Sequence, residues 1–159
     1  MKRTSVKTLL LWGLFGLAGG MVVNYLWEAS ANALPGLPWL AVIGMLLLSV
    51  VLCVLAWPIK QWRDGDRSTE IDSIQAARVA MMAKAANLAG ALLTGWYGGT
   101  SLFYFVSAGG IRADTGLAML IPVAAAAVLT IVGVVVESFC SLPPGSGGSP
   151  SGEEPSPTA

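Results

Sequence analysis

Few residues of this chain could carry out chemistry, and all of them lie at the edges of apolar segments. The sequence has no histidine. Its two cysteines, Cys53 and Cys140, do not have the close spacing of metal ligands. It has no nucleophile motif and no glycine loop of the phosphate-binding pattern. The ionisable candidates are Lys84, Glu137, Glu28 and Asp114. Because catalysis needs such groups to face a cavity, we expect no enzymatic activity, no cofactor and no metal site.

The composition is that of a membrane protein. Hydrophobic residues make up 55% of the chain, charged residues make up 11%, and the mean hydropathy is +0.70, whereas soluble domains carry about 25% charged residues. The apolar residues form four blocks, and each is long enough to cross a bilayer core, which takes roughly 20 helical residues. The blocks are residues 8–27, 38–57, 85–106 (with the helix extending back to about residue 70) and 116–136.

Long unbroken blocks favour helices over membrane strands, which are short and alternate in polarity. Helices also satisfy their backbone hydrogen bonds internally, as lipid requires. We therefore predict an all-α fold, an integral membrane four-helix bundle over residues 1–140. The remaining segment, 141–159, is rich in Pro, Gly and Ser and is expected to be a disordered cytoplasmic tail.

The basic residues predict the orientation, because Lys and Arg in short loops stay in the cytoplasm. All but one of the nine basic residues lie before the first block or between the second and third blocks. Both termini are therefore expected to be cytoplasmic. The net charge is zero, so nucleic acid is not an expected partner. The basic residues on this side are Lys2, Arg3, Lys7, Lys60, Arg63, Arg67, Arg78 and Lys84.

A cleavable signal peptide is an alternative for the N-terminus. Basic residues, an apolar stretch and then Ala31 and Ala33 in an A-x-A arrangement fit its pattern. Cleavage after Ala33 would leave three spans. The apolar stretch is longer than the 7 to 15 residues typical of a signal peptide, which favours a retained helix. The mass of the protein would decide.

Lys84 lies about 16 Å from the centre of the third block, at the edge of the hydrocarbon. One interpretation is that its side chain extends to the headgroups. The other is that it pairs with Glu137, which lies at the same depth on the fourth block. Lys84 shares a helix side with small residues that would pack against a neighbouring helix, and this favours the pair. The predicted packing face contains Asn87, Ala91, Gly95 and Gly98.

The first block repeats the pattern of small residues with Gly13, Gly16 and Gly20, which we expect to pack closely on another helix. Asn24 and Tyr104 lie at similar depths toward the outer side, so a polar contact between them is a hypothesis; bonds to backbone or interfacial water are the alternative. Trp96 and Tyr97 lie near mid-bilayer, which means that they pack inside the bundle or that the third span is shifted.

Pro122 is predicted to kink the fourth helix, because it leaves the carbonyl of Ala118 without its helical hydrogen bond. A kink of this kind is tolerated in many membrane helices and serves as a hinge in some transporters.

The favoured function is a scaffold or accessory subunit that packs through small-residue faces in the lipid bilayer, against itself or a larger membrane protein. A small oligomeric transporter or channel is the alternative. Glu28 and Glu137 lie at span boundaries, unlike the mid-membrane glutamate in the first helix of small multidrug transporters, and this favours the scaffold.

The four spans, the polar tail and the block "AARVAMMAKAANLAGALLTGWYGG" resemble an uncharacterised family of small actinobacterial membrane proteins, classed as a domain of unknown function. The resemblance extends from residue 1 to about residue 140 and is most specific from Ala76 to Gly99. It implies four helices and a location in the bacterial plasma membrane. It implies no catalytic residues.

Overall fold

The computed structural model describes residues 4–30, 37–63, 73–107 and 113–140, and nearly all of them are helical. No strand occurs within these ranges. The predicted all-helical fold is confirmed. The helices are α1 (Val6–Ala29), α2 (Trp39–Arg63), α3 (Ser73–Val106), α4 (Ala113–Ala118) and α5 (Leu120–Cys140).

The predicted first and third spans lie inside α1 and α3. The second begins one residue before α2, at Pro38, and the fourth is divided between α4 and α5 at Met119. The described part of the third helix runs from Ser73 to Val106. The expectations for the tail (141–159), for Ala31 and Ala33, and for the loop that carries Arg67 lie outside the described residues.

Three helical segments are long and apolar enough to cross a membrane: Val6–Ala29, Trp39–Pro58 and Ala113–Phe139. Helix α3 is longer, but it is richer in alanine, glycine and hydroxyl residues and therefore less apolar. It packs against α1 and also against α5. A helix covered in this way needs fewer large apolar side chains than a helix that faces lipid.

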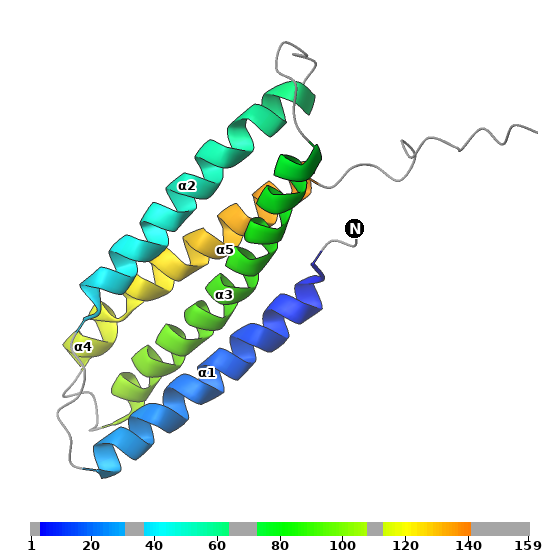
Figure 1. The fold of residues 1–159 in the computed structure, drawn as a ribbon. Coiled ribbons are helices and arrows are strands. Elements are labelled where there is room, and N and C mark those ends of the chain that lie inside the picture. The colour runs from blue at the N-terminus through cyan, green and yellow to red at the C-terminus, as the bar shows by residue number, and fades with distance from the viewer. Residues whose placement is uncertain (1–3, 31–36, 64–72, 108–112, 141–159) are drawn as a thin grey trace, which may run out of the picture.

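The helices form a row in the order α1, α3, α5, α2 (Figure 1). The chain reverses direction at each long connection, so α1 and α3 run parallel and α5 runs antiparallel to both. The contacts confirm this: Gly13 and Gly20 of α1 face Ala91 and Trp96 of α3, respectively. Helix α1 packs extensively on α3 alone, whereas α2 packs mainly on α5.

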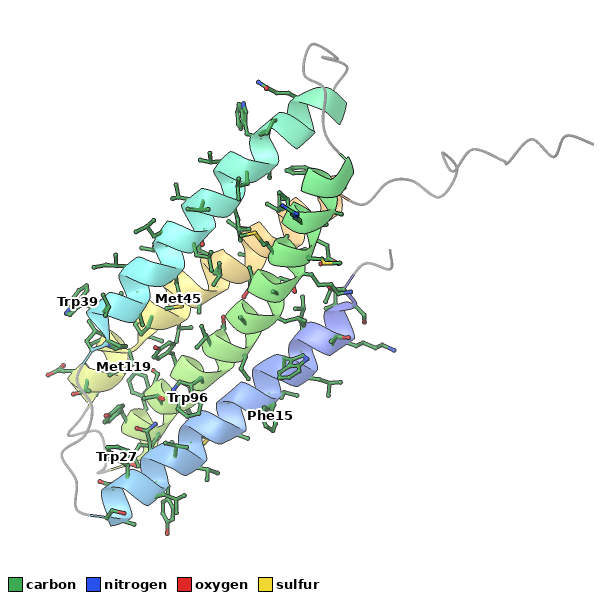
Figure 2. All side chains as sticks on the ribbon, viewed as in Figure 1. Phe15, Trp27, Trp39, Met45, Trp96 and Met119 are labelled. Atoms are coloured by element: carbon green, nitrogen blue, oxygen red, sulfur yellow. The ribbon has the colours of Figure 1, made fainter. Side chains whose placement is uncertain are left out.

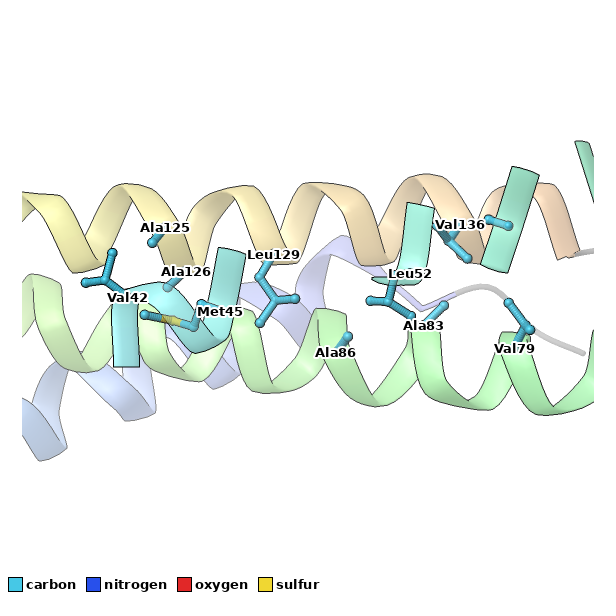
Figure 3. Close-up of a cluster of buried hydrophobic side chains, with 11 residues drawn as sticks. Val42, Met45, Leu52, Val79, Ala83, Ala86, Ala125, Ala126, Leu129 and Val136 are labelled. Carbon is cyan, nitrogen blue, oxygen red and sulfur yellow. The ribbon is translucent and has the colours of Figure 1, made fainter. Parts of the chain in front are cut away.

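The apolar core lies between α2, α3 and α5 (Figure 3). Helix α2 supplies half of the side chains larger than alanine, while α3 and α5 supply four of the five alanines, so the latter two helices approach closely. Leu52, Ala83 and Ala126 are fully buried. The cluster comprises Val42, Met45, Leu52, Ala56, Val79, Ala83, Ala86, Ala125, Ala126, Leu129 and Val136.

The fourth span is interrupted where Pro122 predicts a kink. Helix α4 ends at Ala118, Met119 forms a turn, and α5 begins at Leu120. The carbonyl of Ala118 is the acceptor that an N–H at position 122 would have bonded, and proline has none. Pro122 is fully buried, so the interruption is part of the packed structure.

Candidate functional site

Glycines bring the backbones of α1 and α3 into direct contact. A Cβ added to Gly16 would overlap the carbonyl oxygen of Leu92, and one added to Gly20 would overlap that of Trp96. From the other side, Gly95 faces the carbonyl oxygen of Gly13. No larger residue fits at these positions without separating the helices.

The structure thus brings Gly13, Gly16 and Gly20 of α1 together with Ala91 and Gly95 of α3. The Cβ position of Gly13 lies 3.7 Å from the Ala91 carbonyl oxygen, and Ala91 is buried.

Gly98 does not belong to this contact, because a Cβ added to it would meet nothing within 4 Å. Gly99 takes its place and faces the carbonyl oxygen of Leu17. Gly99 follows Gly95 by four residues and lies on the same side of the helix, whereas Gly98 is turned away.

A second glycine contact joins α3 to α5. A Cβ added to Gly90 would lie 2.5 Å from the Thr130 hydroxyl oxygen, and one added to Gly133 would lie 2.8 Å from the Cβ of Asn87. The sequence reasoning missed Gly90, Gly99 and Gly133 because it assigned α3 one packing face. A central helix has two.

Glu137 is the centre of a half-buried polar cluster that joins Thr4, two residues before α1, to α3 and α5. The Thr4 backbone N–H donates to Oε1 of Glu137 at 2.8 Å, and the Thr4 hydroxyl lies 2.9 Å from Oε1 and 2.8 Å from Oε2. Asn87 Nδ2 donates to Oε2 at 2.6 Å. Hydrogen bonds to a carboxylate are about twice as strong as neutral ones, so the cluster anchors the start of α1.

Lys84 and Glu137 are not brought together, and this corrects the expected ion pair. The Lys84 side chain is exposed, whereas Asn87, one turn further along α3, is completely buried against α5. The amide of Asn87 therefore reaches the carboxylate in place of the ammonium group. Exposure of Lys84 agrees with the first interpretation, in which its side chain extends to the headgroups.

Asn24 bonds Thr100 rather than Tyr104. Its Nδ2 donates to the carbonyl oxygen of Gly20 at 2.7 Å and to the Thr100 hydroxyl at 3.0 Å. The Thr100 hydroxyl donates in turn to the carbonyl oxygen of Trp96 at 3.0 Å. Tyr104, one turn further along α3, is buried, with its ring edge-on to Phe103.

A cavity of about 280 Å³ lies beside the Asn24–Thr100 bond. Three residues of its wall, Trp27, Trp96 and Met119, lie toward the same end of the bundle (Figure 2). Trp96 and Tyr97, whose mid-bilayer positions were left open by the sequence, are half-buried in this wall. The described residues of the lining include no Asp, Glu, Lys or Arg: they are Val23, Asn24, Trp27, Pro38, Trp96, Tyr97, Thr100 and Met119.

The remaining candidates for chemistry stand apart. Glu28 and Asp114 are exposed, and so is Cys53. Within the described part of the chain, no group of three His, Cys, Asp or Glu residues is placed to hold a metal ion. The buried polar cluster and the cavity are therefore the two places of interest.

A family model with the description "Protein of unknown function (DUF3180)" matches residues 9–144. The chain belongs to this family. The DUF3180 match extends from α1 past the end of α5, and it confirms the resemblance to an uncharacterised family. No curated protein and no solved structure matches the chain.

Proposed function

We propose that this DUF3180 protein is a non-enzymatic scaffold or accessory subunit of the bacterial plasma membrane. In this proposal α3 crosses the membrane together with the three more apolar segments, and both termini are cytoplasmic. The distribution of basic residues in the sequence supports the orientation. The observation that carries the function is the close glycine packing through the middle of the bundle.

The half-buried Glu137 cluster and the buried Asn24–Thr100 bond are separated by a tightly packed interval. Glu137 and its partners lie near the start of α1, and the Asn24–Thr100 bond lies near its end. Between them, Gly95 meets the backbone at Gly13, and Gly90 meets Thr130. Ion and solute pathways are lined by polar groups or water along their length. The packing supports a structural role over conduction through one chain.

The outer surface offers places for a second helix. Among the described glycines, Gly44 and Gly98 are those whose added Cβ would meet nothing within 4 Å. Large apolar side chains around them face lipid, and apolar faces alone do not drive association within a membrane. Small residues do, because they let backbones approach. These two positions are therefore the proposed contact points for a partner.

The test is photo-crosslinking in native membranes from position 102, where the exposed Leu102 lies one turn from Gly98 on the same side of α3, followed by mass spectrometry and co-purification. We expect one membrane protein, or a second copy of the chain, to be captured and to co-purify stably. Gly98→Leu should abolish this, and Ala89→Leu, an exposed small residue on the opposite side of α3, should not. The proposal fails if both variants retain the partner equally.

The alternative is a small oligomeric transporter or channel, favoured by the half-buried carboxylate of Glu137. Ionisable groups at membrane depth are common in transport pathways. The purified protein in liposomes distinguishes the two functions. Saturable solute exchange or ion conductance that Glu137→Gln removes would establish transport and overturn the scaffold.

A further inference from the structure

The cavity beside Asn24 contains polar groups that the described residues leave without hydrogen bonds. Asn24 is only 5% exposed, and its Nδ2 is bonded twice, but its Oδ1 accepts no bond from them. The Trp96 indole N–H and the Tyr97 hydroxyl also make none. Hydrocarbon offers polar groups no hydrogen-bond partner. The half-buried Trp96 and Tyr97 and the buried Asn24 therefore offer two donors and one acceptor to a polar molecule in the cavity.

The lining also indicates what kind of molecule fits. Trp27, Trp96 and Tyr97 present aromatic rings, which favour another ring in stacked or edge-on contact. None of the described residues that line the cavity is Asp, Glu, Lys or Arg, so a charged group would lose its hydration without compensation from them. The volume of about 280 Å³ lies just below the range of drug-sized ligand pockets, roughly 300–1,000 Å³. It fits one ring system.

We propose that this cavity binds the ring of an uncharged, lipid-soluble molecule that carries carbonyl or hydroxyl oxygens, as a quinone and its quinol do. Trp96 and Tyr97 donate to ring oxygens, and Asn24 Oδ1 accepts from a ring hydroxyl. A saturated hydrocarbon chain would fill the same space but leave all three groups unbonded.

The ligand enters from the membrane. Val23 is 38% exposed and Trp27 is 47% exposed, so this wall of the cavity reaches the lipid-facing surface of α1. Helix α1 has no extensive contact with α2, and Pro38, just before α2, forms another part of the wall. A molecule dissolved in the bilayer therefore reaches the cavity without crossing the packed interior.

The experiment is a titration of the full chain, in lipid nanodiscs, with a benzoquinone that carries a decyl chain, followed by tryptophan fluorescence. Quinones quench indole fluorescence, and Trp96 lines the cavity. We expect saturable quenching. Val23→Phe, which fills the cavity, should abolish saturation. Val22→Phe, on the lipid-facing side of α1 at 56% exposure, is the matched control and should retain it.

Two further measurements keep the test decisive if Val23→Phe does not fold. Tyr97→Phe removes one hydrogen bond and should weaken binding by roughly three- to ten-fold. Decanol has a chain and no ring, and it should not compete. Quenching that rises linearly with quinone in every variant would overturn the proposal. Competition by decanol at the quinone's own concentration would also overturn it, because the cavity would then be a groove for acyl chains.

Discussion

Replacing Gly99 with alanine should separate α1 from α3, and replacing its neighbour Gly98 should not. The added Cβ at position 99 would overlap the carbonyl oxygen of Leu17 and lie 3.0 Å from its carbonyl carbon. These atoms belong to the backbone of α1, so no side-chain rotation relieves the overlap. At position 98 the same Cβ meets nothing within 4 Å.

The magnitude follows from comparing the two variants. Both replace a helical glycine with alanine, which stabilises a helix by roughly 0.5–1 kcal/mol, so this contribution cancels. Overfilling a packed interface costs about 1–3 kcal/mol. We therefore expect Gly99→Ala to be less stable than Gly98→Ala by about 1–3 kcal/mol, with Gly98→Ala at or slightly above the wild type.

The assay is unfolding in mixed micelles, in which the free energy of unfolding is obtained from tryptophan fluorescence as the fraction of denaturing detergent rises. Gly16→Ala, which meets the Leu92 carbonyl from the other side of the contact, should behave as Gly99→Ala does. Equal stabilities for Gly99→Ala and Gly98→Ala would refute the close approach of the two backbones.

Three other substitutions probe the remaining contacts. Glu137→Ala should lower the unfolding free energy by about 1–3 kcal/mol because it leaves buried donors unbonded. Lys84→Ala should change it by under about 0.5 kcal/mol. Similar losses of stability for both variants would support an ion pair between Lys84 and Glu137. Pro122→Ala should join α4 to α5, and hydrogen exchange should show a newly protected amide at position 122; an unprotected amide there would mean that the kink has another cause. A double-mutant cycle of Asn24→Leu and Thr100→Val should show a coupling in the unfolding free energy of about 0.6 kcal/mol, and at most about 1.7 kcal/mol. Strictly additive effects of the two substitutions would mean that the hydrogen bond contributes nothing to stability.

Features that depend on one segment were predictable from the sequence. The interruption at Met119 follows from the covalent structure of Pro122, and it occurs wherever the helix packs. The spacing of Gly16 and Gly20 specifies a close contact on one side of α1, although it does not name the partner helix. Helix lengths follow from bilayer thickness in the same way.

Features that depend on three helices were not predictable. Depth and a shared helix side suggested Lys84 as the partner of Glu137, but Asn87 lies at a similar depth on the same side. The rotation of α3 about its axis decides between the two residues, and packing against both neighbouring helices sets that rotation. The same rotation separates Gly99 from Gly98. The cavity brings together α1, α3, Pro38 and Met119, and no single segment carries a pattern for it.

The packing of α1 on α3 in parallel register is tested most directly by a disulfide between cysteines at positions 24 and 100, in a chain whose Cys53 and Cys140 are replaced with serine. Asn24 and Thr100 are hydrogen-bonded at 3.0 Å, so the two thiols should crosslink rapidly in intact membranes, within one full-length chain. A cysteine at position 22, on the lipid-facing side, should not crosslink to position 100. Crosslinking from position 22 but not from position 24, or loss of residues 1–33 from the mature protein, would contradict the account.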